Sequence, residues 1–319
     1  MKNDVTVIGP LNVDILVRGE APRELPVLTG WEGPAAVELA VAGSVGYTVQ
    51  DMAKLGLEVS VSACVADDVF GPVILRQLRE NSVGTDWVTT VKGASSGIGV
   101  YVLAFGSRKR PLFYQLPTHD PWPLRYDEHQ VERMLNSRLI HNGGFLHFLQ
   151  MYESDIVGLF SKARARGLIT SVDSQFPLHA MKPPWMEVMR RVLPSLDILF
   201  CNEHEARGLT AVEEAQGAAR SLLDSGVRTV VIKQGEAGSE VFQQGWHHHE
   251  PAFRGGELVD SIGAGDAYDA GFLAALLETR PLQECARMGS ICAGCSVTAA
   301  GGWAGMPDRK TVEGMLSRR

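Results

Sequence analysis

Hydrophobic residues along this 319-residue chain gather in short continuous runs, separated by stretches in which apolar positions recur at helical spacing. A short apolar run bounded by Gly, Pro or polar residues predicts a buried strand, whereas helical spacing predicts an amphipathic helix. Strands are predicted at 5–17 with a break at Gly9 and Pro10, 59–68, 167–174, 196–202 and 228–235. Helices are predicted at 43–56, 70–82 and 266–278. This alternation predicts an α/β fold with a mainly parallel sheet whose faces are covered.

Two stretches depart from the alternation of strands and helices. Residues 30–40 and 98–115 have the pattern of exposed or edge strands and not of helices. The chain contains no internal repeat, no low-complexity tract and no evident linker. We therefore expect a single domain that spans residues 1–319.

Composition limits the classes of partner. Apolar residues make up 45% of the chain, and the formal net charge is −7 with no long run of Lys or Arg. These values predict a folded core and argue against nucleic acid or an anionic membrane surface as the main partner. Asp4 interrupts any apolar leader and no apolar run is long enough to span a bilayer, so we expect a cytoplasmic protein. The five unevenly spaced cysteines favour buried thiols over a disulfide framework.

The most informative segment is DSIGAGDAYDAGFLAALLE, residues 260–278. Gly263, Ala264 and Gly265 carry little or no side chain, so an anion can approach their backbone N–H groups at the start of the following helix. Asp266 falls in the first turn, where the helix dipole favours its ionised form. An anion cradle beside a carboxylate base suits transfer of a phosphoryl group to a hydroxyl. On these residues alone, an Asp that only complements the helix dipole is equally open.

The same segment resembles the C-terminal signature of the ribokinase-like (pfkB) carbohydrate kinases, D-T-x-G-A-G-D-x-F-x-x-G. Ser261 replaces the Thr and keeps a hydroxyl, and Tyr268 replaces the Phe and keeps an aromatic ring. The resemblance implies a three-layer α/β/α fold with a small β-sheet lid formed by residues 30–40 and 98–115. It also implies an ATP-dependent kinase that phosphorylates a hydroxyl of a sugar or sugar-like molecule, with Asp266 as the base.

Two further motifs follow predicted strands at their carboxyl ends, where open α/β sheets bind ligands. Asn202 and Glu205 in NEHE resemble the family's N-x-x-E motif, which implies that they hold Mg²⁺ through water near the phosphates of ATP. The same spacing is typical of a capping box that opens a helix, and both roles stay open. Lys233, Gly235 and Gly238 resemble the family's nucleotide-binding turn, although such glycines are also common in hairpins. The chain has no GxxxxGK[ST] motif and no HRD or DFG set.

The substrate side departs from the family pattern. Asp14 ends the first strand in GPLNVD, and in the family this Asp binds acceptor hydroxyls, with Asn12 as a lesser candidate. A carboxylate can accept hydrogen bonds from two adjacent hydroxyls of a sugar. The family's G-G-x-x-x-N stands here as AGSVGY, which keeps Gly43 but places Tyr47 where the sugar-binding Asn is expected. The acceptor is therefore open. The alternatives are a nucleoside kinase of the same superfamily and a catalytically silent nucleotide- or sugar-binding protein.

The remaining features are secondary. The resemblance implies a homodimer formed through the lids and a monovalent cation, K⁺, near Asp260–Ser261 and residues 296–302. The CxxC at residues 292–295 favours packing over metal binding, because it lies among small helical residues without a second pair. The three histidines at 247–249 predict a solvated strand or loop with no evident carboxylate partner. The basic residues 108–110 either form a surface turn or reach an anionic acceptor.

Overall fold

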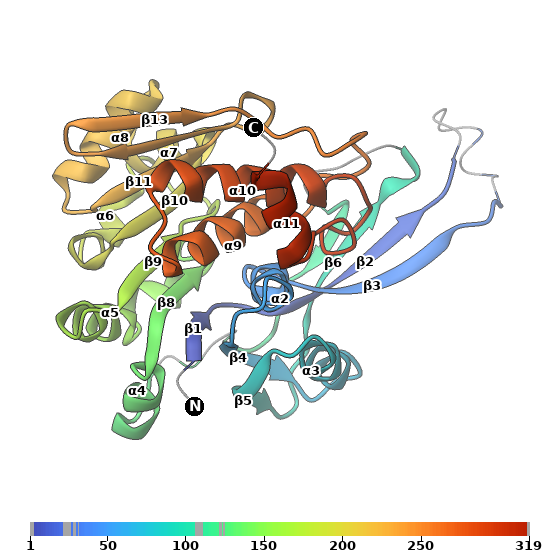
Figure 1. Cartoon of the computed structure of the whole chain (residues 1–319). Coiled ribbons are helices and arrows are strands. Elements are labelled where there is room, and N and C mark those ends of the chain that lie inside the picture. Colours follow the sequence, from blue (N-terminus) through green and yellow to red (C-terminus); the bar gives the residue numbers. More distant parts are fainter. Residues whose placement is uncertain are drawn as a thin grey trace.

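The computed structural model describes residues 3–317, apart from 22–26, 28, 29, 31, 106–110, 121, 122 and 124. These residues form a larger sheet with helices packed on both of its faces, and a smaller sheet that projects beyond the edge of the larger one (Figure 1). Helices, sheet and helices are the three layers that the sequence predicts.

The larger sheet contains nine strands among the described residues, in the order β13-β12-β11-β10-β9-β8-β1-β4-β5. They are β1 (Asn3–Ile8), β4 (Val59–Ala66), β5 (Gly84–Val91), β8 (Ser137–Gly143), β9 (Ile169–Asp173), β10 (Ile198–Asn202), β11 (Thr229–Lys233), β12 (Ser239–Gln243) and β13 (Trp246–Glu250). Neighbouring strands from β5 to β11 pair in parallel, whereas β12 pairs antiparallel with both of its neighbours, β11 and β13. The parallel strands end at one edge, which brings their last residues together.

Both faces of the central strands are buried, and this explains their continuous apolar sequence. In β10, Ile198 and Phe200 pack into one hydrophobic cluster, whereas Leu199 and Cys201 pack into a second cluster on the opposite face. Full burial of an aliphatic or aromatic side chain stabilises a fold by about 1.5–3 kcal/mol. The sheet is therefore held from both sides by the helices that cover it.

The helices divide between the two clusters. The first cluster includes residues of α2 (Gly46–Lys54), α3 (Phe70–Glu80), α9 (Ala264–Leu277), α10 (Leu282–Ser296) and α11 (Arg309–Leu316). The second includes residues of α4 (Glu128–Met134), α5 (Ile156–Ala165), α6 (Met186–Met189), α7 (Glu203–Thr210) and α8 (Ala215–Asp224). Short 3₁₀ turns are η1 (Leu103–Phe105), η2 (Leu149–Glu153), η3 (Leu193–Ser195) and η4 (Gly235–Ala237). The predicted helices at 43–56, 70–82 and 266–278 correspond to α2, α3 and α9.

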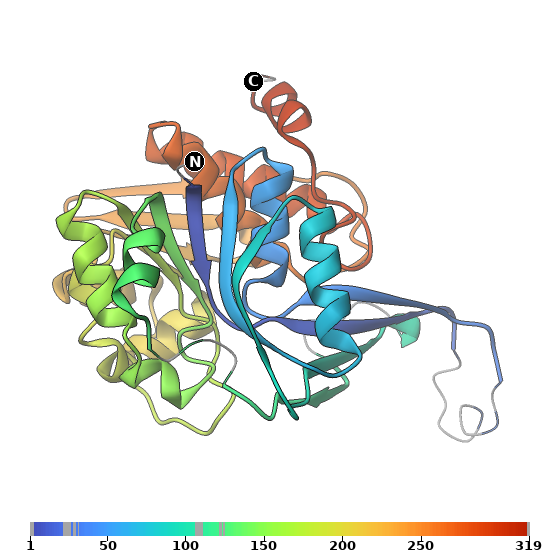
Figure 2. The same cartoon turned by 90° about the horizontal axis from the view of Figure 1, so that it is seen from below.

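The smaller sheet has the strand order β3-β2-β6-β7. Its strands are β2 (Asn12–Arg18), β3 (Ala36–Ala42), β6 (Gly97–Val102) and β7 (Phe113–Gln115). Residues 30–40 and 98–115 thus contribute to this sheet, as predicted. The predicted strand at 5–17 breaks as expected, but its second half becomes β2 and joins the smaller sheet, which the sequence pattern did not indicate. Figure 2 shows β2 and β3 extending together away from the body.

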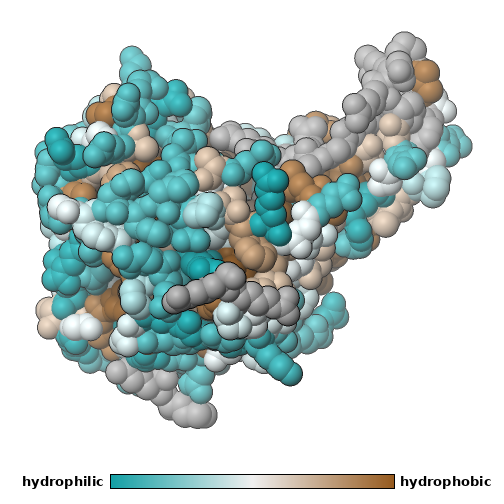
Figure 3. Space-filling model, turned by 45° about the horizontal axis from the view of Figure 1, so that its top comes forward, coloured by the Kyte–Doolittle hydropathy of each residue, from teal (hydrophilic) through white to brown (hydrophobic). Residues whose placement is uncertain are grey.

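The smaller sheet exposes several large apolar side chains. Val37 is 63% exposed and Phe113 is 65% exposed. In the space-filling view, hydrophobic residues gather along this sheet and where it meets the body, whereas most of the visible body is hydrophilic (Figure 3). Within the described part of the chain, no helix combines the length and the apolar character needed to cross a membrane.

Candidate active site

The first turn of α9 has the geometry of an anion site. Gly263 precedes the helix with φ of +72°, a conformation that glycine adopts without strain, and a Cβ atom there would lie 3.2 Å from the ring of Tyr47. The N–H of Ala264 makes only a long hydrogen bond of 3.4 Å to the carbonyl oxygen of Ser261. Because the first N–H groups of a helix lack intrahelical partners, this turn offers donors and partial positive charge to an anion.

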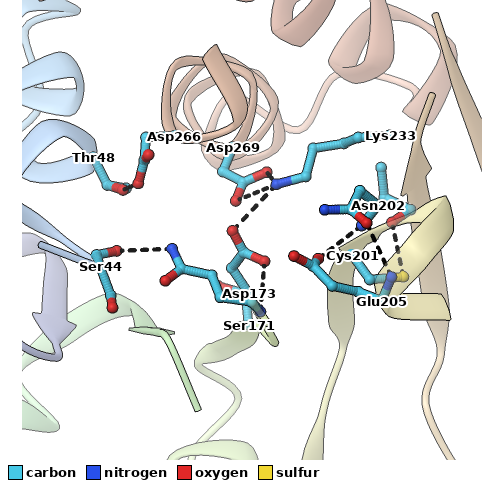
Figure 4. Close-up of polar contacts among 12 residues, drawn as sticks. Ser44, Thr48, Ser171, Asp173, Cys201, Asn202, Glu205, Lys233, Asp266 and Asp269 are labelled. Atoms are coloured by element: carbon cyan, nitrogen blue, oxygen red, sulfur yellow. Dashed lines mark hydrogen bonds and ion pairs between the residues drawn. The ribbon is translucent and has the colours of Figure 1, made fainter. Parts of the chain in front are cut away.

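Asp266 lies in this first turn and is half-buried. Thr48 of α2 donates its hydroxyl to Asp266 Oδ1 over 2.6 Å (Figure 4). Burial raises the pKa of Asp266 to about 7; the Thr48 hydrogen bond opposes this shift, and the negative charge of Asp173 adds to it. A carboxyl group with a pKa near neutrality can serve as a general base at physiological pH.

A second carboxyl group, Asp14, faces the same site from the smaller sheet. It lies inside β2 and not at the end of the first strand, which corrects the sequence prediction. Burial raises the pKa of Asp14 to about 7, and the charge of Asp266 contributes to this shift. Tyr47 donates its hydroxyl to Asp14 Oδ2 over 3.2 Å. Gly99 of β6 lies opposite Asp14 on the neighbouring strand β2. A Cβ atom on Gly99 would lie 2.6 Å from Asp14 Oδ1.

Asn12 and Gly43 lie at the base of the smaller sheet. Gly43 packs against the backbone of β2, so that a Cβ atom there would lie 2.8 Å from the nitrogen of Asn12. Asn12 Oδ1 is buried and has no hydrogen-bond partner within the described residues. The structure therefore places Gly43 against Asn12 and Tyr47 against Asp14, with Asn12 and Asp14 both on β2. Their predicted role in substrate binding stays a prediction. Next to Gly43, the hydroxyl of Ser44 lies 2.7 Å from Nδ1 of His147.

Asn202 and Glu205 form a capping box at the start of α7. Asn202 Oδ1 accepts a hydrogen bond of 2.9 Å from Glu205 N, and Glu205 Oε2 accepts one of 2.8 Å from Asn202 N (Figure 4). Burial and the charge of Asp173 raise the pKa of Glu205 to about 7. The helix-capping interpretation of NEHE is therefore confirmed.

The oxygen atoms at this cap suit only a metal ion that takes few of its ligands from the protein. Glu205 Oε2 and Asn202 Oδ1 already accept backbone hydrogen bonds, which leaves Glu205 Oε1 as the carboxylate oxygen without such a bond. Among the described residues, no group of three or more His, Cys, Asp or Glu side chains is arranged to hold a metal ion. Mg²⁺ usually keeps several waters and binds phosphate oxygens beside one or two protein carboxylates, so these residues fit that ion in such a setting.

Gly235 and Gly238 form the turn between β11 and β12. Gly238 N donates to Gly235 O over 3.0 Å, and Gln234 N donates to Gly238 O over 2.8 Å. Because β11 and β12 are antiparallel neighbours, this segment is a hairpin turn, as the alternative interpretation of these glycines predicts. It lies at the same edge of the sheet as Asn202, since β10 and β11 pair in parallel with Asn202 opposite Lys233.

The side chain of Lys233 points towards Asp173 and Asp269 and not along the turn at 235–238. Its Nζ atom lies 3.0 and 3.1 Å from the two carboxylate oxygens of Asp269, and 3.2 Å from Asp173 Oδ2 (Figure 4). Asp173 ends β9 and Asp269 lies in α9, one turn after Asp266. The sequence motifs assigned Lys233 to the nucleotide, but in the structure its ammonium group is paired with two acids.

Three residues of the site were missed from the sequence. Thr48, Asp173 and Asp269 contact Asp266 or Lys233. Thr48 and Asp173 belong to no motif of the sequence analysis, and Asp269 falls at a variable position of the signature at 260–271, where no role was assigned to it. A signal existed for two of them. Asp173 falls at the carboxyl end of a predicted strand, where ligand sites of parallel sheets lie. Asp269 follows Asp266 by three positions, which places both on one side of a helix.

The other singled-out residues lie away from this site. His247 and His249 converge on Glu240, with His249 Nδ1 3.0 Å from Glu240 Oε1, so the expectation of no carboxylate partner is wrong. Their side chains are exposed, as a solvated strand predicts. The cysteines at 292–295 are free and buried, in agreement with packing. The basic residues 108–110 lie outside the described residues.

Comparisons with known proteins agree with the predicted family. The sequence profile of the pfkB family carbohydrate kinases matches residues 35–309. A ribokinase of Arabidopsis thaliana is 26% identical over 329 aligned residues, covering 98% of this chain and 80% of that protein. The structure of Arabidopsis thaliana ribokinase complexed with ribose and ATP has a TM-score of 0.79 at 24% identity, and it covers 100% of both chains. An adenosine kinase from Sinorhizobium meliloti has a TM-score of 0.79 at 23% identity, covering 99% of this chain and 100% of that one. The chain therefore belongs to the pfkB family of carbohydrate kinases and is, as its sequence predicts, an ATP-dependent phosphotransferase.

Proposed function

We propose that this protein transfers the γ-phosphoryl group of ATP to a hydroxyl of a sugar or sugar-like molecule, with Asp266 as the general base. The observation that carries the proposal is the position of Asp266. Its carboxyl group lies in the first turn of α9, beside the backbone donors of residues 263–265, and it faces Asp14 on the smaller sheet. An anion site, a base and a group that can bind hydroxyls are thus adjacent.

The reaction at this site is a direct displacement. The acceptor oxygen attacks the γ-phosphorus, the bond between that phosphorus and the bridging oxygen of the β-phosphate breaks, and the hydroxyl proton passes to Asp266. The products are the phosphorylated acceptor and ADP. The N–H groups of Gly263, Ala264 and Gly265 stabilise charge on the phosphoryl oxygens, and one well-aimed donor of this kind contributes about 3 kcal/mol.

Two cations belong to the proposal. Asn202 and Glu205 would hold Mg²⁺ through water, and the ion supplies charge neutralisation to the phosphates when it is bound. We also expect K⁺ near Asp260 and the loop at 296–302. Asp260 supports this expectation by linking the two segments, since its carboxylate accepts hydrogen bonds from Ile262 N at 3.1 Å and Gly301 N at 3.0 Å.

The smaller sheet is proposed as a lid over the acceptor. It carries Asp14 and Asn12 on β2, so its closure would bring these side chains onto the acceptor and exclude water from the reaction. We further propose that residues 1–319 act as one domain and form a homodimer through this sheet in the cytoplasm, without a nucleic-acid or membrane partner. The exposed apolar side chains of β3 and β7 support the dimer.

A carbohydrate is the preferred acceptor over a nucleoside. Tyr47 is only 4% exposed, packs with Leu16 and Ile262, and donates its hydroxyl hydrogen bond to Asp14. A ring covered in this way has no open face on which a base could stack. The similarity to an adenosine kinase keeps the nucleoside kinase as the alternative. A silent binding protein is disfavoured because it has no need of a partly buried acid at the anion cradle.

The test is release of ADP by the purified protein in the presence of Mg²⁺, screened across neutral sugars, sugar acids and nucleosides. Turnover with a sugar that disappears in the Asp266→Asn variant supports the proposal. Turnover confined to nucleosides favours the alternative. Binding of ATP without ADP release for any acceptor would instead identify a silent binding protein.

A further inference from the structure

Lys233 is buried between two acids. Its side chain is 14% exposed, whereas those of Asp173 and Asp269 are 7% and 1% exposed. Both oxygens of Asp269 lie within 3.1 Å of the Lys233 ammonium group, and Asp173 Oδ2 lies at 3.2 Å. We call these three residues the lysine triad. It joins the ends of β9 and β11 to α9, and Figure 4 shows it between the Asp266–Thr48 pair and the capping box.

The triad touches the anion cradle itself. A Cβ atom built on Gly265 would lie 3.3 Å from Lys233 Nζ, so the ammonium group lies against the backbone of the turn that receives the phosphates. Asp269 follows Asp266 by one helical turn. Any charge on Lys233 therefore acts on both the phosphates and the proposed base at close range, in a setting that is largely screened from water.

The triad pairs one basic side chain with two acidic ones. Burial opposes ionisation of Lys233, but the charges of Asp173 and Asp269 raise its pKa, so the ammonium group stays charged. Burial raises the pKa of Asp269 well above its usual range, whereas the charge of Lys233 lowers the pKa of Asp173 despite burial. The triad thus places one ammonium group between two carboxyl groups whose pKa values are shifted in opposite directions. A second acid would be unnecessary if Lys233 only needed a structural partner.

We propose that Lys233 is a positioning residue for phosphoryl transfer. Its ammonium group compensates the negative charge of the nucleotide phosphates and of Asp266 from the sheet side. Asp173 partly neutralises that ammonium group and so limits the compensation. The proposal rests on the proposed function, because it assumes that nucleotide binds at the first turn of α9. It differs from a purely structural tie in one respect. Removal of Lys233 and removal of the Asp173 charge must have opposite electrostatic effects.

The prediction concerns the protonation of Asp266, whose surroundings include several other charged or titratable groups. From the elements packed around it these are Asp14 on β2, Tyr47 and Asp51 on α2, Tyr101 on β6, Asp173 on β9, Lys233 on β11 and Asp269 on α9. Of the triad, Asp173 raises the pKa of Asp266 and Lys233 lowers it. The two can be changed one at a time while the other groups are kept.

The experiment compares Lys233→Met and Asp173→Asn with the unchanged protein. Binding of the non-hydrolysable analogue AMP-PNP with Mg²⁺ is measured by calorimetry, without acceptor, and kcat/KM for the best acceptor is measured against pH. For Lys233→Met we expect AMP-PNP binding to weaken about tenfold. The acidic limb of the pH profile should move up by about one unit. For Asp173→Asn we expect equal or tighter binding and an acidic limb at lower pH.

The matched control is Arg228→Met, which removes one positive charge immediately before β11, at the end opposite to Lys233. Arg228 is 61% exposed and pairs with Asp197, so we expect neither binding nor the pH profile to change. If both triad variants lose AMP-PNP binding and kcat/KM to a similar extent and the acidic limb does not move, the proposal is overturned. The triad would then have only a structural role. If Lys233→Met does not fold, Asp173→Asn decides alone, and an unmoved or raised limb overturns the proposal. Failure of the unchanged protein to bind AMP-PNP would overturn the proposed function as well.

Discussion

The two halves of the site present the same chemical group in different surroundings. On the phosphate side, Asp266 lies in a helix turn with Lys233 close by, and Thr48 donates a hydrogen bond to it. On the acceptor side, Asp14 lies on a strand, where Tyr47 donates a hydrogen bond and the nearby charges of Asp266 and Asp260 are both negative. Burial raises the pKa of each carboxyl group to about 7. The phosphate side compensates its acid with a cation, and the acceptor side does so only with a neutral hydroxyl.

In the proposed function, this difference follows from what each half has to bind. The phosphate side would receive a polyanion and would therefore need positive charge near the proposed base, Asp266. The acceptor side would receive hydroxyls, which donate hydrogen bonds to a carboxylate without any cation. Tyr47 already uses one oxygen of Asp14, so that fewer acceptor positions remain for substrate hydroxyls. Changes on the phosphate side should therefore affect turnover, whereas changes on the acceptor side should affect the choice of substrate.

The largest expected effect is on the phosphate side. Asp266→Asn should lower kcat by about 10²–10⁴-fold, because the amide keeps the hydrogen bond from Thr48 but cannot take a proton. Binding of ATP should change little, since the backbone cradle is untouched. Steady-state kinetics on the best substrate and calorimetry with AMP-PNP test both statements.

A matched control for this change is Asp224→Asn at the exposed end of α8, which should leave kcat unaltered. If Asp266→Asn keeps more than about a tenth of the original kcat, the phosphate side does not determine turnover through Asp266, and the distinction between the two halves is wrong. A general base normally contributes far more than that factor.

The second prediction concerns the acceptor side. Tyr47→Asn should free both oxygens of Asp14 and restore an amide to the pocket, which should shift the ranking of substrates towards ordinary sugars such as ribose and fructose. A site that pairs substrate polar groups discriminates strongly, so a change of about tenfold in relative kcat/KM is expected. A panel of sugars and nucleosides assayed with both proteins measures it.

Tyr47→Phe separates the two contributions of the tyrosine. It removes only the hydroxyl that binds Asp14 and keeps the ring that packs with Leu16 and Ile262. A partial shift with Phe and a full shift with Asn would assign selection to both the hydroxyl and the ring. An unchanged rank order in both variants would mean that Tyr47 does not select the acceptor.

A smaller effect is expected at the capping box. Glu205→Gln should raise the Mg²⁺ concentration needed for half-maximal activity several-fold, because the amide lacks the charge that attracts the ion. Gln is also a capping-box residue, so α7 should stay capped and its stability should hold. Activity titrated with Mg²⁺ gives the curve, with Glu203→Gln in the same first turn as the control. If the Mg²⁺ activation curves of Glu205→Gln and the unchanged protein superimpose, Glu205 does not hold Mg²⁺ and only caps α7.

How far the sequence predicts this molecule depends on how local each feature is. The α/β architecture was predictable because strands such as β10 bury both faces and therefore show unbroken apolar runs. The position of Asp266 in the first turn of a helix was predictable because the glycine turn and the helix lie in one short segment. The transfer of β2 to the smaller sheet was not predictable, since a two-residue break at Gly9 and Pro10 does not say which sheet the chain enters next.

The rest of the site is assembled from distant parts of the chain. Thr48 and Asp266 are 218 positions apart, and Lys233 is 60 positions from Asp173 and 36 from Asp269. No local pattern records such pairings, which arise only when the parallel strands end at one edge under α9. The direction of the Lys233 side chain is likewise a tertiary property, and for this reason the motif assigned it to nucleotide alone.

The smallest expected effect treats the two halves alike. A carboxyl group whose pKa is higher in the folded than in the unfolded protein stabilises the fold below its unfolded pKa, near 4, and this contribution is lost as the pH rises through its folded pKa. For Asp14 and Asp266 that loss occurs between about pH 4 and pH 7. Asp266→Asn and Asp14→Asn should therefore each raise the Tm by a few degrees at pH 8, with the gain shrinking towards pH 4. Thermal unfolding of both variants across this range provides the measurement. A gain for Asp14→Asn but none for Asp266→Asn would mean that Lys233 already compensates the base in full, and the difference between the two halves would then extend to stability.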